Sequence, residues 1–240
     1  MDRNNKTCAV DLINQGASLI AIGNYNDAIS VLRKAHASAK LIKSGNRRDE
    51  RTRLKFEESL DLWVSQTPDF DNDNDGSDGD DHGFICKQPI HVPVSVRDNV
   101  QQHHAAITVS IIFNLALAHH LLGLVGNDKS ITLLSKAVKF YEYSFQIYQG
   151  QAGGKELKLE NTQFLMVSIN NSGQCHRALG RDQSAASCFQ ELLSTLVLLK
   201  YFSRDSRSRY PSFAETLCEG FFRNISRWVS RENLVAAGAA

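Results

Sequence analysis

A fixed spacing of small and apolar residues recurs three times along the chain. In the first copy, successive members are seven, five, four and three residues apart, at Gly16, Gly23, Ala28, Leu32 and Ala35. The third copy keeps these intervals at Gly173, Gly180, Ala185, Phe189 and Leu192. The second copy lies between them in the sequence, has nine extra residues after its second member and runs through Ala116, Gly123, Ala137, Tyr141 and Ser144. Glycine and alanine at such intervals let antiparallel helices approach closely, so the spacing predicts helix pairs that stack to bury their apolar faces.

Composition and periodicity agree with helices. Hydrophobic residues make up 42% of the 240 residues, and only four are proline. We predict helices over residues 9–22, from 24 onward, from about 104 to a stop at Gly123, and over 159–179 and 182–200. A capping box of Ser212 and Glu215 begins a last helix. The prolines of residues 84–96 indicate an extended segment, and residues 150–156 are predicted to be a loop.

Two of the predicted helices have apolar faces with helical spacing. In the helix after Gly123, one apolar stripe consists of Ile131, Leu134, Val138, Tyr141, Phe145 and Tyr148. A second stripe of apolar or small residues lies beside it, at Leu133, Ala137, Phe140, Ser144 and Ile147, so we predict that this helix is buried on two sides. In the last helix, the face predicted to be buried consists of Phe213, Leu217, Phe221, Ile225 and Trp228.

The repeated stretches resemble a known family. "NQGASLIAIGNYNDAISVLRKA" and "NSGQCHRALGRDQSAASCFQELL" resemble the tetratricopeptide (TPR) repeat, and "FNLALAHHLLG…KAVKFYEYS" is similar to a degenerate copy. The hallmark Trp is replaced by Leu12, Ile112 and Ile169, and the closing Pro is missing. The copies start 100 and 57 residues apart, against about 34 in a regular array. "NLALAHHLLG" with "NNSGQCHRALG" also resembles a group of uncharacterised algal repeat proteins, which implies a fold but no function.

We therefore expect an all-α chain, with antiparallel helix pairs stacked as a short TPR-like α-solenoid. Residues 1–65 would hold the first pair and a basic and acidic extension, and 66–103 an acidic loop and an extended segment. Residues 104–200 would hold the second and third pairs, and 201–240 a capping helix and a frayed tail. These parts are expected to form one structural domain.

The acidic run "DNDNDGSDGDDHG", residues 71–83, begins like an EF-hand calcium loop. The place of the closing bidentate carboxylate is taken by His82, and neither flank has a helical pattern, so we interpret the run as a disordered acidic insertion. Weak divalent binding is an alternative. Seven Asp between residues 69 and 82 leave +8 on the rest of a chain whose net charge is +1. The insertion could therefore screen the basic segments 47–55 or 200–209 from acidic partners.

No motif supports catalysis, a metal or a cofactor. The pairs His103-His104 and His119-His120 diverge by about 100° on a helix, so neither pair converges on one ion. His119 stands where the TPR family usually has Tyr and is expected to be a buried, hydrogen-bonded core residue. There is no H-E-x-x-H, G-x-S-x-G or phosphate-binding glycine loop. We expect Cys175 and Cys188 to be core thiols, and no enzyme.

The best functional signal is an asparagine two residues before the small residue of each copy: Asn14, Asn114 and Asn171. The TPR resemblance implies that these amides line a concave face and hydrogen-bond the backbone of an extended ligand. An alternative is that they only satisfy neighbouring helices. Further ligand-binding candidates on the same face are Phe113, Leu117, Gln174 and Arg177. The basic clamp of chaperone-tail-binding members is absent, because Ile13, Ala17 and Val167 stand where several of its cations would be.

The sequence thus favours a non-catalytic scaffold that binds a protein or peptide segment, in the cytoplasm or nucleus. The odd count of five cysteines, without a C-x-x-C pair, suggests a reducing compartment. Nucleic-acid or acidic-partner binding through the basic segments is the alternative, and it is less favoured because acids are interleaved with the bases. An enzyme is less favoured still. No apolar run approaches 18 residues, so we expect no membrane span. The sequence does not indicate an oligomeric state.

Overall fold

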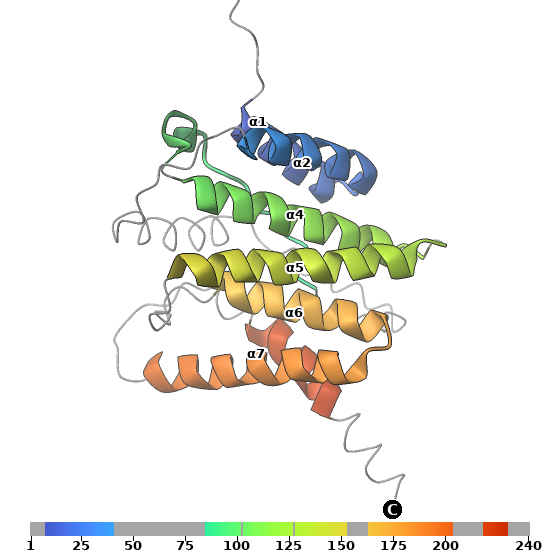
Figure 1. Ribbon diagram of the computed structural model, residues 1–240. Helices are drawn as coiled ribbons and strands as arrows, with labels where there is room; N and C mark the ends of the chain where they lie inside the picture. Colours follow the sequence, from blue (N-terminus) through green and yellow to red (C-terminus); the bar gives the residue numbers. More distant parts are fainter. Residues whose placement is uncertain are drawn as a thin grey trace, which may run out of the picture. The chain divides into compact units, whose positions relative to one another are not determined.

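The computed structural model describes residues 8–40, 85–101, 103–126, 128–152, 163–203 and 218–229 (Figure 1). Within these ranges the chain is all-α and contains no strand, as the sequence predicts. The helices are α1 (Ala9–Ala21), α2 (Tyr25–Lys40), the 3-10 helix η1 (Val94–Asn99), α4 (His104–Leu124), α5 (Ser130–Ala152), α6 (Gln163–Ala178) and α7 (Asp182–Ser203). Residues 218–229 are also helical. The acidic run 69–82, the basic segment 47–55 and the Ser212–Glu215 capping box lie outside the described residues.

The chain divides into two compact units. Unit 1 consists of Met1–Asp69 and Lys87–Phe164, and unit 2 of Phe70–Cys86 and Leu165–Ala240. The first two predicted helix pairs, α1–α2 and α4–α5, therefore belong to unit 1. The third pair, α6–α7, belongs almost entirely to unit 2.

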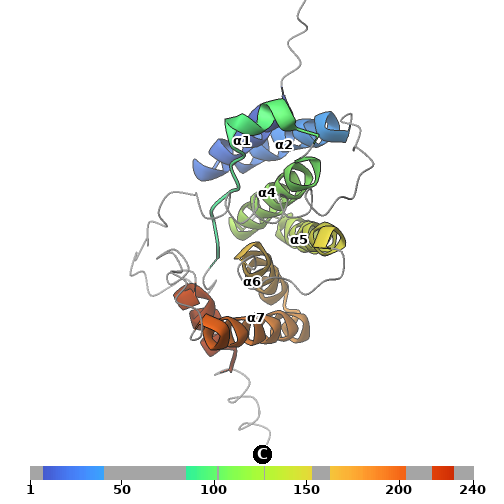
Figure 2. The ribbon, with the colours of Figure 1, turned by 90° about the vertical axis from the view of Figure 1, so that its left-hand side faces the viewer.

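In unit 1, α4 is the central helix. It packs against α2 on one side and α5 on the other, and α1 packs against α2 (Figure 2). Its side chains are buried nearly all round, from Ala106 to Leu121. By length and composition alone α4 is apolar enough to cross a membrane, but most of it is buried inside the fold. A helix that is surrounded by other helices is apolar on every side, as a membrane-spanning helix is, because no side of it faces water. We therefore interpret α4 as the core helix of this unit.

The repeated glycines lie at close helix contacts. A Cβ on Gly16 of α1 would be 2.6 Å from Leu32 Cγ of α2. In unit 2, a Cβ on Gly173 of α6 would be 2.9 Å from Phe189 Cε1 of α7. Both distances are shorter than a carbon–carbon contact allows, so only glycine permits this approach. The spacing correctly predicted a close helix contact at each glycine, but the side chain that faces the glycine is the larger residue of the spacing, Leu32 or Phe189, and not an alanine.

The helix stops follow the glycines, with one correction. Gly23 and Gly180 have φ values of 79° and 67°, the left-handed conformation expected of a glycine that ends a helix. Gly123 does not end its helix, because α4 continues to Leu124 and Gly126 takes the positive φ of 75°. Gly123 instead faces Leu134 of α5, whose Cγ would lie 2.9 Å from an added Cβ. Its small size serves packing and not the turn.

The predicted apolar face of α5 is only partly buried. Tyr141 and Tyr148 are 1% and 0% exposed, whereas Ile131 is 74% exposed. Ile131 lies in the first turn of α5, ahead of Leu134, the first buried position of the helix. The end of α5 was also misplaced, since residues 150–152, predicted as loop, still belong to the helix. In the last helix Phe221 and Ile225 are buried, as their spacing predicts.

Candidate functional site

The candidate site in unit 1 consists of two asparagines that hold an extended segment of the same chain. Asn114 of α4 accepts a hydrogen bond from the Ile90 N–H (2.8 Å) and donates one to the Ile90 carbonyl (2.9 Å). Asn14 of α1 makes the same pair of bonds with Val92, each 2.8 Å long. One amide therefore satisfies both the donor and the acceptor of one residue's backbone.

Among the residues of unit 2 that the structure describes, the same arrangement occurs once. Asn171 of α6 accepts from the Cys86 N–H (3.0 Å) and donates to the Cys86 carbonyl (2.9 Å). Asn170 donates to Asn171 Oδ1 (3.2 Å) and itself accepts from Asn224 Nδ2 (2.6 Å). All three asparagines are buried. This chain of amides fixes which end of the Asn171 side chain is the acceptor.

The part of the held segment that belongs to unit 1, residues 87–93, forms neither helix nor strand and is extended (Figure 2). Ile90 and Val92 are each 1% exposed, while His91 between them is exposed. Alternation with a period of two is the pattern of an extended backbone, in which residues i and i+2 present their N–H and C=O groups along the same edge. Asn114 and Asn14 thus bind one edge of the segment.

The prolines of the segment stand where no donor is needed. Pro89 and Pro93 precede and follow the residues that the asparagines bind, and proline has no N–H. Proline also biases the residue before it towards an extended conformation, which favours the observed path at Val92. Beyond the segment, Arg97 of η1 pairs with Asp11 of α1, both partly exposed. The prediction of an extended segment holds for residues 85–93 and fails from Val94, where η1 begins.

The other four candidate residues differ in their surroundings. Phe113 is 1% exposed, and its ring packs against those of Tyr141 (centroids 5.7 Å apart) and Phe164 (5.6 Å). Leu117 is fully buried. In unit 2, Gln174 is buried, and neither its Nε2 nor its Oε1 has a hydrogen-bond partner. Arg177 is half-buried in the last turn of α6.

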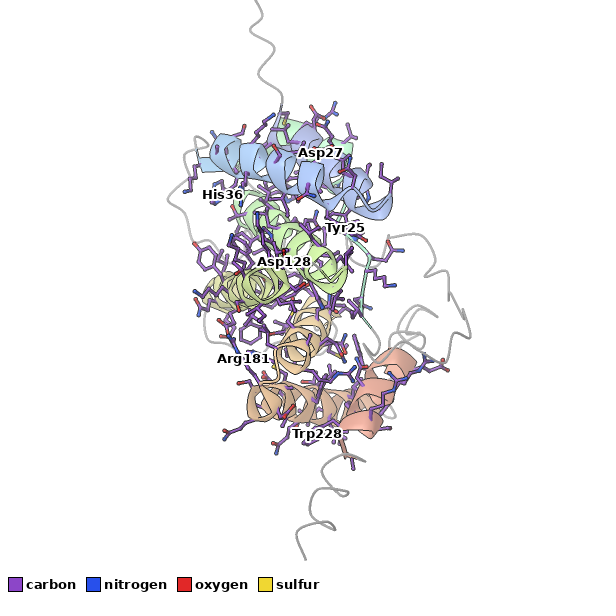
Figure 3. The ribbon with its side chains drawn as sticks, turned by 90° about the vertical axis from the view of Figure 1, so that its right-hand side faces the viewer. Tyr25, Asp27, His36, Asp128, Arg181 and Trp228 are labelled. Atoms are coloured by element: carbon purple, nitrogen blue, oxygen red, sulfur yellow. The ribbon has the colours of Figure 1, made fainter. Side chains whose placement is uncertain are left out.

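His119 and His120 of α4 are core residues. The His119 Nδ1 lies 2.7 Å from the Leu115 carbonyl oxygen, to which it donates. Burial lowers the pKa of His119, the hydrogen bond opposes this shift, and the charges of Arg33 and Lys136 add to it. The His120 Nδ1 lies 3.4 Å from the Tyr141 hydroxyl. On α2, burial and then Lys40 lower the pKa of His36, which is labelled in Figure 3. The described residues contain no cluster of three metal-ligating side chains.

The two buried thiols, Cys86 and Cys175, are core groups as well. None of the five cysteines forms a disulfide, and burial raises the pKa of both the Cys86 and the Cys175 thiols. Cys188 is only half-buried, so the prediction of a core thiol is right for Cys175 alone. A thiol that resists deprotonation is a poor nucleophile. Cys86 and Cys175 are therefore packing residues.

Sequence reasoning missed the link between the asparagines and residues 85–93. The signal was present, because this is a stretch in which two prolines bracket β-branched residues two apart. In comparisons with known proteins, no family model, no curated protein and no solved structure matches this chain.

Proposed function

We propose that the chain is a non-catalytic protein-binding module of TPR-like helix pairs, which holds an extended segment of another protein with asparagine side chains. The observation that carries this proposal is the double hydrogen bond from one amide to one backbone residue, found at Asn14, Asn114 and Asn171. Each pair binds peptide backbone, which every protein segment offers. Affinity would come from these bonds and from buried apolar side chains, as in other modes of extended-peptide recognition.

The chemistry of the site favours a neutral segment. The groups that bind the held backbone are uncharged amides, and no cation contacts Ile90 or Val92 in the hydrogen bonds described. Nucleic-acid binding requires lysines and arginines against phosphates. Of the two basic segments considered for that role, residues 47–55 and residues 204–209 of the segment 200–209 lie outside the described residues. The absence of a disulfide among the five cysteines fits a reducing compartment, and we propose the cytoplasm or nucleus.

The proposal is tested by selection of peptides on the chain. A phage library displaying 12-residue peptides in many copies is panned against the wild type, and the selected peptides are titrated by calorimetry. Removal of two hydrogen bonds in Asn14→Ala should weaken binding about tenfold or more. Gln146→Ala, on the exposed surface of α5, is the matched control and should leave binding unchanged.

Two results would count against the module. Peptides that bind Asn14→Ala as tightly as the wild type would place the binding surface elsewhere. A chain that selects no peptide, even as the Ile90→Ala, Val92→Ala double variant in which its own segment is weakened, would not be a module of this kind.

A further inference from the structure

The segment that occupies the asparagines of unit 1 has a pattern of its own. Ile90 and Val92 bury their side chains and pair their backbones with Asn114 and Asn14. His91 between them is exposed, and so is Lys87. Prolines stand immediately before Ile90 and immediately after Val92. The pattern is therefore Pro, a buried apolar residue, any residue, a buried β-branched residue, and Pro.

We propose that unit 1 recognises partner segments of this pattern, and that residues 89–93 are an internal ligand which such a segment displaces. The inference rests on the proposed function and names the class of partner: an extended, proline-bracketed protein segment, uncharged at its two buried positions. A carboxylate or ammonium group at either position would be buried without a counter-charge, which excludes acidic and basic residues there. The exposed positions tolerate charge.

Residues 89–93 can be replaced by a partner segment because only side chains hold their backbone. All four hydrogen bonds at Ile90 and Val92 come from side chains of α1 and α4, so no strand ladder of the fold is broken when the segment leaves. A second segment of the same backbone geometry would restore each donor and acceptor. The prolines lower the entropic cost of ordering an incoming segment, because they restrict it to extended conformations beforehand.

Residues 89–93 compete with a partner segment for Asn14 and Asn114, and this competition sets the apparent affinity of the partner. A tethered segment is present at an effective concentration of about millimolar. The apparent affinity of a partner is reduced by the fraction of molecules in which the site is free. Weakening the internal segment should therefore strengthen partner binding, although it removes contacts from the fold. A purely structural segment would not behave in this way.

The experiment uses a fluorescein-labelled peptide of residues 87–96 and the full chain. Binding is followed by fluorescence anisotropy for the wild type, for Ile90→Ala with Val92→Ala, and for the exposed-site control Lys87→Ala. We expect the double variant to bind the peptide at least tenfold more tightly than the wild type, and the control to match the wild type. Adding Asn14→Ala to the double variant should remove the gain. A peptide carrying Ile90→Asp and Val92→Asp should not bind.

A double variant that keeps its helical circular dichroism and gains no affinity for the peptide would overturn the inference. If that variant fails to fold, amide hydrogen exchange of the wild type tests whether residues 89–93 are released. Exchange of the Ile90 and Val92 amides at least tenfold faster than that of Ala116 in α4 would support release of the segment, and exchange at the rate of Ala116 would overturn it. Peptides selected on the wild type that depend on Asn14 would still support the proposed module if this inference failed.

Discussion

Replacing Asn114 by Ala should be one of the most destabilising single changes in unit 1. Asn114 is 0% exposed and Ile90 1% exposed, and two hydrogen bonds of 2.8 and 2.9 Å join them. Alanine leaves the Ile90 N–H and carbonyl buried without partners. Each orphaned group costs about 1–3 kcal/mol, so the free energy of unfolding should fall by about 2–6 kcal/mol. This is a large share of the 5–15 kcal/mol typical of a domain.

Asn14→Ala is the matched comparison, because it removes the same two bonds at a partly exposed site. Water can replace the lost amide there, so the cost should be the net value of two hydrogen bonds, about 1–3 kcal/mol. Urea unfolding followed by circular dichroism measures both values. A loss for Asn114→Ala no larger than that for Asn14→Ala, or below about 1 kcal/mol, would refute the role assigned to burial.

Three further predictions concern packing, protonation and thiol access. Gly16→Ala should lower the melting temperature, because its Cβ would lie 2.6 Å from the facing leucine side chain, whereas Gly150→Ala in α5, with nothing within 4 Å, should leave it unchanged or raise it. Since burial lowers the pKa of His119, stability should be present above about pH 6.5 and be lost as the pH falls through the folded-state pKa; His119→Gln should reduce that loss in urea titrations between pH 7 and pH 5. Cys86 and Cys175, buried and with raised pKa values, should react with a thiol reagent only after denaturant is added, and fast labelling of the native chain would contradict their burial.

Local periodicity carried most of the secondary structure. Helix α1 was expected over residues 9–22 and spans Ala9–Ala21, and α7 was expected over 182–200 and spans Asp182–Ser203. These signals are local, because apolar spacing and a terminal glycine act within a few residues. The errors arose where one residue type serves two purposes. Gly123 was assigned to a helix stop, but it is needed for the contact with Leu134.

The occupant of the asparagines could not be found from local pattern. The residues that Asn114, Asn14 and Asn171 bind are 24, 78 and 85 positions away in the sequence. Such pairings depend on how the helices pack, and no periodicity within one element encodes them. What the sequence does encode is the two halves separately: an asparagine at the same place in each repeat, and a proline-bracketed stretch suited to an extended path.

The two asparagines of unit 1 differ in a way that gives exchange a direction. Asn114 and Ile90 are buried, so breaking their hydrogen bonds would leave buried polar groups without partners. Asn14 is half-buried, so water can reach its amide once that pair opens, although Val92, like Ile90, is 1% exposed. Displacement should therefore begin at Val92 and end at Ile90, and an incoming segment would gain its first hydrogen bonds at Asn14 before the buried pair is disturbed. Faster amide exchange at Val92 than at Ile90 is the signature of this order, and it follows from solvent access alone, whichever protein supplies the second segment.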